Sequence, residues 1–466
     1  MRIAREYRVP FVDRVEMQTR WASWLITNAS PENAAMRADV RRGAPTVTWE
    51  WDTHGWIPWM QFFYDWRFAD VMGRGEIDMV QTNGMMRQTA FGADGGVLWD
   101  YHDPDAPFVQ ARYCSNFPIV DIDGDGIPEL ICPRMVDGAM HLCIVNARTG
   151  MLKRHIPYPF QDKRSGDMRA PITVANVTGK PVPSDIVLAW DYRWVGVLDS
   201  DLDLVWEHTI DHAAGRRHTT MGHTPFAGDI DGDGHDEIMA GSCLIDHTGE
   251  ILWVADDLPA LCRDGHADSV QIHSLAPGEG PRVLMSTGAY CFSREGRLLW
   301  GRDELKHGQA LKVGRIRGDI EGRQVVVYEG ASRVDKSLPD KVIALTRDGD
   351  RLWEREVVQP DMQEGGFGFW LGDWDGDGFD EVFVNDPEKV NILNGYGEVL
   401  ETIPGHLVYV FDLVGDLRAE AVVVDTIAPG MTVRVIENDA PNRNPTTGVE
   451  PKRRETTREM YDCTRY

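Results

Sequence analysis

The chain alternates short apolar runs with polar turns, and three kinds of segment recur in the same order. An apolar run leads into a polar, often acidic loop. A second apolar run follows this loop, and a Gly-containing turn then precedes a short run that often ends in Trp. Turn residues between apolar runs are hairpin signals. Each unit therefore predicts several consecutive antiparallel strands.

These units recur eight times along the chain. We place the first strands at 68–71, 118–121, 173–176, 226–229, 270–273, 312–315, 371–373 and 409–412. We place the second strands at 77–80, 130–132, 186–188, 238–240, 283–285, 325–327, 382–384 and 421–424. A repeat of about 40 to 58 residues with several strands per copy is typical of a β-propeller. The sequence predicts an all-β fold, an eight-bladed β-propeller, with seven blades as the fallback.

The last unit lacks the closing hairpin that ends the others. We expect the segment from Thr46 to Trp51 to supply its outer strand, because this pairing closes the ring and covers exposed sheet edges. The predicted organisation is a single propeller over 46–440. It follows an N-terminal extension, 1–45, that is partly helical, and precedes a tail, 441–466, that packs on the propeller.

Composition narrows the choice of partners and compartment. The 466 residues carry a formal net charge of -26, which argues against binding to nucleic acid or to an anionic membrane surface. Seven cysteines without a Cys-x-x-Cys pair do not indicate a disulfide framework. The N-terminus has no apolar segment typical of a signal peptide, and no window approaches a membrane span. We expect a cytoplasmic monomer, or a secreted protein if a signal was removed.

Three of the polar loops share the pattern Asp-x-Asp-Gly-Asp-Gly-x-x-Glu. They run from Asp121 to Glu129, from Asp229 to Glu237 and from Asp373 to Glu381. This spacing is that of a calcium loop, with carboxylates at alternating positions and a backbone carbonyl at position 7. The alternative is an acidic turn without metal. The predicted Ca2+ ligands are Asp121, Asp123, Asp125, Ile127, Glu129, Asp229, Asp231, Asp233, His235, Glu237, Asp373, Asp375, Asp377, Phe379 and Glu381. We expect the metal to act structurally.

Chemistry is expected where the inner strands begin, because these positions surround one mouth of a propeller channel. Several consecutive units place a cation, an imidazole or a phenol there, which suits an anionic substrate and proton transfer. A single His beside a strand is more often a hydrogen-bonding group, but the recurrence at His223, His266 and His307 favours function. The catalytic candidates are His223, His266, His307, Arg169, Tyr113, Arg112 and Lys306.

Aromatic residues provide candidates for binding a carbohydrate. Tryptophan rings stack on sugar faces, although Trp between the first and last blades could equally be packing that closes the ring. The substrate-binding candidates are His54, Trp56, Trp59, His218, His406 and Tyr192. The chain has no Gly-x-Ser-x-Gly elbow, no phosphate-binding Gly-rich loop and no His-Glu-x-x-His. These absences leave a serine hydrolase, a nucleotide enzyme and a zincin unsupported.

Four segments resemble the family 11 polysaccharide lyases, the rhamnogalacturonan lyases. They are 222–238, 306–314, 412–420 and 461–466. The resemblance implies an eight-bladed propeller with calcium loops that cleaves an acidic plant or microbial polysaccharide containing rhamnose and uronic acid, by β-elimination. Two features depart from the family. Residues 1–45 differ from its β-rich N-terminal extension, and Gly314-Arg-Ile-Arg317 replaces its usual Gly-Asp-Leu-Asp. The departures bear on the substrate more than on the fold.

The reaction that the resemblance implies needs three functions. The substrate carboxylate must be neutralised, by Arg169, Arg112, Lys306 or a bound calcium. A base must remove the C5 proton, for which the candidates are His223, His266, His307 and Tyr113. A His or Tyr must then protonate the departing O4. Two alternatives stay open: an exo-acting lyase or rhamnosidase for terminal rhamnose–glucuronate linkages, and a non-catalytic, integrin-like binding propeller.

Overall fold

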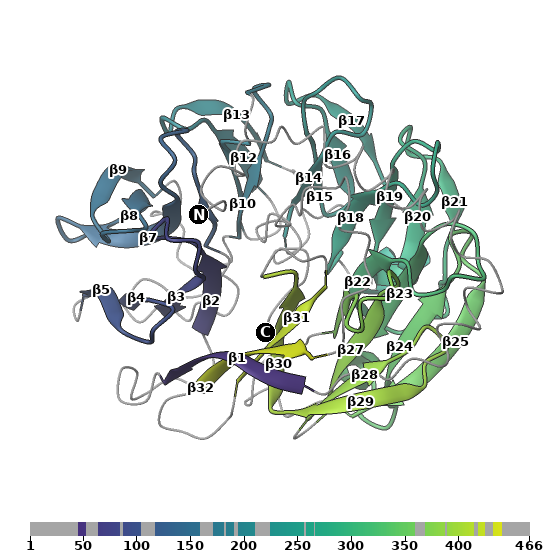
Figure 1. The fold of residues 1–466 in the computed structure, drawn as a ribbon. Helices are drawn as coiled ribbons and strands as arrows, with labels where there is room; N and C mark the ends of the chain where they lie inside the picture. Colours follow the sequence, from purple (N-terminus) through teal and green to yellow (C-terminus); the bar gives the residue numbers. More distant parts are fainter. Residues whose placement is uncertain are drawn as a thin grey trace.

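The protein folds into eight four-stranded antiparallel sheets that stand around one ring (Figure 1). The structure, a computed structural model, describes residues 45–52, 64–83, 87–103, 117–158, 171–180, 183–190, 194–209, 224–255, 258–264, 266–358, 369–386, 389–413, 418–424 and 432–439. The all-β, eight-bladed prediction is confirmed, and the fallback of seven blades is set aside. The predicted N-terminal extension and C-terminal tail lie outside the described residues.

The eight blades follow the chain. Blade 1 contains β2 (Tyr64–Ala69), β3 (Asp78–Asn83), β4 (Arg87–Phe91) and β5 (Val97–His102). Blade 2 contains β6 (Ile119–Val120), β7 (Glu129–Val136), β8 (Ala139–Asn146) and β9 (Leu152–Pro157). Blade 3 contains β10 (Ile172–Ala175), β11 (Asp185–Trp190), β12 (Trp194–Leu198) and β13 (Leu204–Thr209). Blade 4 contains β14 (Phe226–Gly228), β15 (Glu237–Ala240), β16 (Cys243–Ile245) and β17 (Ile251–Val254).

The second half of the ring repeats the pattern. Blade 5 contains β18 (Val270–His273), β19 (Arg282–Met285), β20 (Tyr290–Phe292) and β21 (Leu298–Trp300). Blade 6 contains β22 (Gly308–Gly314), β23 (Gln324–Glu329), β24 (Asp340–Leu345) and β25 (Arg351–Val357). Blade 7 contains β26 (Phe369–Gly372), β27 (Glu381–Asp386), β28 (Lys389–Leu393) and β29 (Val399–Pro404). Blade 8 contains β30 (His406–Phe411), β31 (Glu420–Val424), β32 (Thr432–Asn438) and β1 (Pro45–Asp52).

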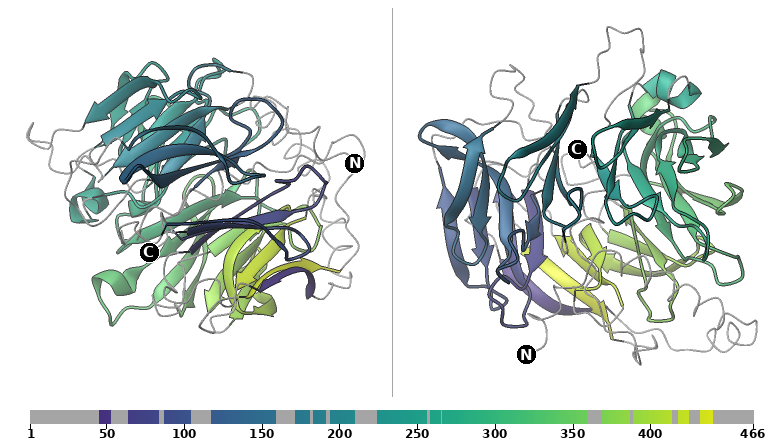
Figure 2. Two further views of the ribbon diagram at one scale, coloured as in Figure 1. Left: turned by 90° about the vertical axis from the view of Figure 1, so that its left-hand side faces the viewer. Right: turned by 90° about the horizontal axis from the view of Figure 1, so that it is seen from above.

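The first strand of each blade is innermost. Neighbouring first strands contact one another, as β14 does with β10 and β18, and β22 with β18 and β26. The second strands are covered on both faces, so all six residues of β23 are buried and its sequence is nearly continuous in apolar residues. In the outer strand β13, by contrast, four of the six residues are exposed. The views in Figure 2 show the sheets side by side around the ring.

The ring closes through strands from both ends of the described chain. β1 pairs antiparallel with β32, with Thr46 opposite Glu437 and Trp51 opposite Val433, and it is the purple strand beside the yellow ones in Figure 1. This pairing completes the sheet of blade 8 and covers its edge. A second contact joins blade 8 to blade 1, because buried Arg67 on β2 donates to the hydroxyl of Tyr409 on β30 at 2.5 Å.

In the described residues, the recurring Trp connects five of the blades to the next one along the chain. Its indole Nε1 donates to a backbone carbonyl in the closing hairpin of the following blade, at 2.6–2.9 Å. The pairs are Trp99 with Ala147, Trp206 with His247, Trp253 with Arg294, Trp300 with Arg347, and Trp353 with Gly395. Blade 2 has Arg154 at this position, and its guanidinium donates to the carbonyl of Ser200 in blade 3 at 2.7 Å.

The same Trp rings pack on the Gly of the turn that they contact. Gly296 has φ +80°, and a Cβ there would lie 2.6 Å from the ring of Trp253. Only Gly adopts this conformation at little cost, and only Gly leaves room for the ring. The recurring Gly turn and Trp in the sequence are therefore two parts of one contact between blades.

Aspartates in two of the acidic loops also join blades. The backbone NH of Asp236 donates to the carbonyl of Asn176 in blade 3 at 2.8 Å, and its carboxylate accepts from the Asn176 NH at 2.6 Å. Asp380 makes the same pair of contacts with Arg315 in blade 6, at 2.8 and 2.7 Å. The Asp before the final Glu of these loops therefore holds the neighbouring inner strand.

The helical segments among the described residues are short. They are α3 (Pro259–Asp264), the 3-10 turn η3 (Thr287–Ala289) and α4 (Ala331–Val334). α3 contacts η3, and η3 contacts β22. All three lie in connections at the end of the blades where the inner strands begin. The described residues include no helix long and apolar enough to cross a bilayer.

Candidate functional site

Two groups of polar residues lie at opposite ends of the inner strands. Histidines with a buried carboxylate occur where inner strands begin, and the acidic loops occur where inner strands end. The predicted site residues Lys306, His266, His307 and His406 lie within the described chain. The predicted residues His54, Trp56, Trp59, Arg112, Tyr113, Arg169, Tyr192, His218 and His223 lie outside the described residues.

The histidine cluster joins blades 5 and 6. Asp268, which is fully buried just before β18, lies between two imidazoles. Its Oδ1 is 3.4 Å from Nε2 of His266, and its Oδ2 is 3.4 Å from Nε2 of His307. The two rings are 6.2 Å apart between centroids. The structure therefore brings together two of the predicted catalytic histidines and adds a carboxylate between them.

Gln309 completes the cluster. Its Nε2 donates to Oδ1 of Asp268 at 2.9 Å, and its Oε1 lies 3.2 Å from Nε2 of His307. An imidazole nitrogen that faces acceptors carries a proton, so Nε2 of His307 is the donor toward Asp268 and Gln309. A buried carboxylate that fixes the imidazole tautomer is a common arrangement around a general base.

Backbone contacts fix where these side chains begin. The hydroxyl of Thr287 donates to the carbonyl of His266 at 3.2 Å, and the NH of Gly330 donates to the carbonyl of His307 at 2.7 Å. The NH of Lys306 donates to a carboxylate oxygen of Glu329 at 2.6 Å, and the Lys306 side chain is exposed. The histidines are thus held by β18, β22, η3 and the end of β23.

Gly308 allows the two blades to approach at this point. A Cβ at Gly308 would lie 1.9 Å from the carbonyl oxygen of Ser286. The inner strands are also joined by the side-chain amide of Gln271, which donates to the carbonyl of Leu311 at 2.9 Å. The close approach of β22 to blade 5 is what places His307 beside Asp268.

His406 and Tyr290 are buried at other positions in the fold. His406 is the first residue of β30 in blade 8, where it is buried opposite Val424. Tyr290 on β20 is buried in blade 5. Its hydroxyl accepts from the NH of Ala260 at 3.1 Å and contacts Asp303. Tyr290 therefore holds α3 on the blade.

Sequence reasoning missed Asp268 and Gln309. A signal for them exists, because blades 5 and 6 begin with the matching pairs His266-x-Asp268 and His307-x-Gln309. Residues i and i+2 of an extended segment lie on the same side. The pairs therefore predict that a polar residue lies beside each histidine. Which strands become neighbours is decided by the packing of the blades in the ring.

The three acidic loops have a common internal structure. In each, the carboxylate of the first Asp accepts from the NH of the Gly five residues later, at 2.9–3.1 Å. The final Glu is buried and accepts from the NH of the second residue of the loop, at 2.8–3.1 Å. These final residues are Glu129, Glu237 and Glu381. Each loop is thus folded around its own carboxylates.

Burial makes the negative charge of these carboxylates costly. Burial, assisted by the neighbouring Asp carboxylates, raises the pKa of Glu237 to about 8. Burial also raises the pKa of Glu129 to about 7 and holds the pKa of Glu381 well above its usual range. Oε1 of Glu237 and Oδ1 of Asp121 are buried and accept no hydrogen bond from the described residues. A proton or a bound cation would remove the cost of burying such oxygens.

The loops fit a metal ion in their donor chemistry. Ligand oxygens of the first Asp, the third-position Asp and the final Glu lie within 4.8 Å of one another in all three loops. Oxygen-only carboxylate donors suit a hard cation such as Ca2+. The predicted backbone ligands Ile127, His235 and Phe379 occupy position 7 of these loops. Calcium itself stays a prediction.

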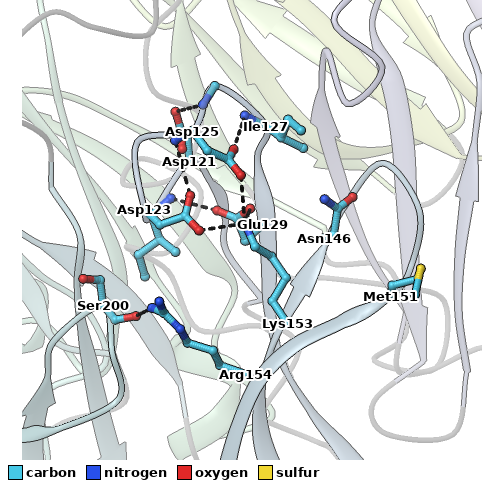
Figure 3. A network of polar contacts seen from close by, with 12 residues as sticks. Asp121, Asp123, Asp125, Ile127, Glu129, Asn146, Met151, Lys153, Arg154 and Ser200 are labelled. Carbon is cyan, nitrogen blue, oxygen red and sulfur yellow. Dashed lines mark hydrogen bonds and ion pairs between the residues drawn. The ribbon is translucent and has the colours of Figure 1, made fainter.

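The loop of blade 2 differs because a lysine from its own outer strand reaches into it (Figure 3). Nζ of Lys153 lies 2.7 Å from Asp123, 3.0 Å from Asp125 and 2.8 Å from Glu129. Burial opposes the charged ammonium, but these hydrogen bonds outweigh it and raise the pKa of Lys153 above its usual value. This loop already contains a cation, which a metal ion would have to displace.

The fold and these loops define an eight-bladed β-propeller in which acidic turns join the first and second strands of three blades. Solved structures with a similar fold are known. No protein-family model and no curated protein sequence matches the chain. The rhamnogalacturonan lyase YesW is similar at a TM-score of 0.56 and 17% identity, over 87% of this chain and 76% of that one. The rhamnogalacturonan lyase of Bacillus licheniformis is similar at 0.56 and 18%, over 82% and 73%. The Vibrio cholerae biofilm matrix protein Bap1 is similar at 0.56 and 15%, over 88% and 92%. At these identities the likeness establishes the fold.

Proposed function

We propose that this protein is a polysaccharide lyase that cleaves a glycan containing rhamnose and uronic acid by β-elimination. The observation that carries the proposal is the buried carboxylate of Asp268 between the imidazoles of His266 and His307. The cluster lies where two adjacent inner strands begin. The similarity of the fold to rhamnogalacturonan lyases supports the same class of substrate.

The cluster can supply the proton transfers of the elimination. His266 is 23% exposed at its side chain, so it is the imidazole that a substrate reaches, and it acts as the base toward the C5 proton. The C5–H and C4–O4 bonds break, a C4=C5 double bond forms, and the departing O4 takes its proton from a second His or Tyr at the mouth. His307, which is 9% exposed, holds Asp268 in place beside His266.

Charge on the substrate also needs neutralisation. Removal of the C5 proton builds negative charge on the uronate carboxylate, and a cation beside it lowers the barrier. Lys306 provides an exposed ammonium next to His307. Arg112, Tyr113, Arg169 and His223 are proposed to reach the same mouth from other blades. A metal ion in the acidic loops neutralises their carboxylates and fixes the turns, away from the reacting atoms.

The test is the growth of the ultraviolet band of the unsaturated uronate with rhamnogalacturonan, its oligomers and rhamnose-capped glucuronates. His266→Ala should lower kcat by about 10²–10⁴-fold, the usual contribution of a general base. Asp268→Asn should also lower kcat and shift the pH–rate profile, because the imidazoles lose the anion between them. His155→Ala changes an exposed histidine on β9 of blade 2 and should leave turnover unchanged.

The other outcomes would contradict the proposal in distinguishable ways. New reducing ends without an unsaturated band would indicate a hydrolase such as a rhamnosidase. Binding of a polysaccharide without turnover would indicate a non-catalytic propeller. Turnover that survives His266→Ala and His307→Ala would place the reaction elsewhere in the molecule.

A further inference from the structure

Within the part of the chain that the structure describes, the acidic loop of blade 4 is the one that has an imidazole nitrogen among its possible ligands. His247 lies in the hairpin between β16 and β17, and its Nδ1 points at the loop. Nδ1 is 3.6 Å from Oδ2 of Asp233 and 3.9 Å from Oε1 of Glu237. Nδ1 is also 3.6 Å from Oδ2 of Asp246, so the imidazole lies among three carboxylates.

The oxygen that His247 faces has no hydrogen bond. Glu237 is 1% exposed, and its Oε2 accepts from the NH of Ile230 at 2.8 Å. Oε1 accepts no hydrogen bond from the described residues, and Glu237 belongs to two groups of possible ligands, one with Asp233 and His247 and one with Asp229 and Asp231. A buried carboxylate oxygen without a donor is costly, and a cation is the partner that removes this cost.

A second histidine holds the imidazole of His247 in place. The rings of His235 and His247 are stacked, with centroids 4.3 Å apart and planes 22° apart. Nδ1 of His235 lies 2.8 Å from the carbonyl oxygen of Val177 in blade 3, and a carbonyl only accepts, so this nitrogen donates. His235 is thus fixed by the neighbouring blade, and its ring orients that of His247.

The spacing of the donor atoms is that of ligands around one ion. Two donors at about 2.0–2.2 Å from a metal lie roughly 3–4.4 Å apart. The separations of 3.6 and 3.9 Å fall within this range. Oδ1 of Asp233 is already used by the NH of His235, at 2.8 Å, so Oδ2 is the oxygen left for an ion.

We propose that the blade 4 loop is a mixed histidine–carboxylate site for a borderline divalent cation such as Mn2+, Co2+ or Zn2+. Its ligands are His247, Asp233 and Glu237, with Asp229 and Asp231 adjoining. Imidazole favours these ions over Ca2+, which takes oxygen ligands. At the hairpin position of His247, blade 2 has Ala147 and blade 7 has Gly395, so their loops present oxygen donors alone.

The test uses the full chain freed of metal by a chelator and then titrated with Mn2+, Co2+, Zn2+ or Ca2+. His247→Ala should weaken binding of Co2+ and Zn2+ at one site by at least tenfold and leave binding of Ca2+ unchanged. In the Mn2+-loaded protein, electron spin-echo spectroscopy should show coupling to an imidazole nitrogen, and this coupling should disappear in His247→Ala. His155→Ala should behave as the wild type in both measurements.

Two results would overturn the proposal. The first is an affinity for Co2+ and Zn2+ that His247→Ala leaves unchanged. The second is a Mn2+ spectrum without nitrogen coupling, which would mean that the imidazole is only a neighbour of the carboxylates. Both measurements report on the metal alone, so they are independent of whether the protein is a lyase.

Discussion

Lys153 gives the sharpest test of how the acidic loops are stabilised. In Lys153→Met the three contacts at 2.7, 3.0 and 2.8 Å are lost, while the aliphatic part of the side chain is retained. Glu129, which has a fully buried side chain, then has no cation beside it. Without calcium, we expect the variant to be less stable than the wild type.

The magnitude follows from the burial of the partners. Removing one member of a fully buried ion pair costs about 3–5 kcal/mol, and an exposed pair contributes about 0.2–1 kcal/mol. The Lys153 side chain is 25% exposed and that of Asp125 is 43% exposed, so only the contact with Glu129 approaches the buried case. We expect a loss of about 2 kcal/mol in the free energy of unfolding.

Calcium should reverse this loss, because the vacated carboxylates form an oxygen-only site. A ligand at a hundred times its Kd stabilises the native state by about 2.7 kcal/mol. The assay is urea unfolding of wild type and Lys153→Met in chelator and in calcium, with the bound calcium counted. Lys341→Met is the matched control, since Lys341 contacts Glu354 at 2.9 Å on the outer surface of blade 6.

The reasoning would be refuted if Lys153→Met were as stable as the wild type in chelator. It would also be refuted if the variant bound no more calcium than the wild type. A loss of similar size in Lys341→Met would show that any surface lysine behaves in this way, so that the buried Glu129 has no special effect.

Two further predictions concern stability. Gly296→Ala should lower the melting temperature more than Gly95→Ala, because both have φ +80° but only at Gly296 would the new Cβ meet a ring, that of Trp253 at 2.6 Å; equal losses would exclude the packing argument. Burial raises the pKa of Asp185, so its contribution to stability is full below the ordinary value of 3.8 and is lost as the pH rises through the raised value. The stability of the wild type relative to Asp185→Asn, in urea midpoints, should therefore fall with rising pH, and a constant difference would contradict the shift.

The outer strands of the blades and the strand that closes the ring could largely be predicted from the sequence. The Gly turns followed by Trp predicted the outer strands, and the missing hairpin of the last unit predicted that an N-terminal strand, now seen as β1, would pair there. These features are readable because turns and strands depend on residues close together in the chain. What the Trp contacts was not readable, since its partner carbonyl is 41 to 48 residues further along.

The candidate sites also divide into features that the sequence determined and contacts that only the tertiary structure decided. The sequence by itself determined the repeats, the eight blades, the carboxylate spacing of the loops and the histidines at the start of blades 5 and 6. Only the tertiary structure decided that Asp268 lies between His266 and His307, that Lys153 fills one loop and that His247 faces another. Lys153 is at a bulge in its outer strand where most of the other blades have Leu, and its neighbours in the chain do not indicate that it reaches the loop. Local chain geometry fixes turns and strands, whereas contacts between side chains of different strands exist only once the ring has formed.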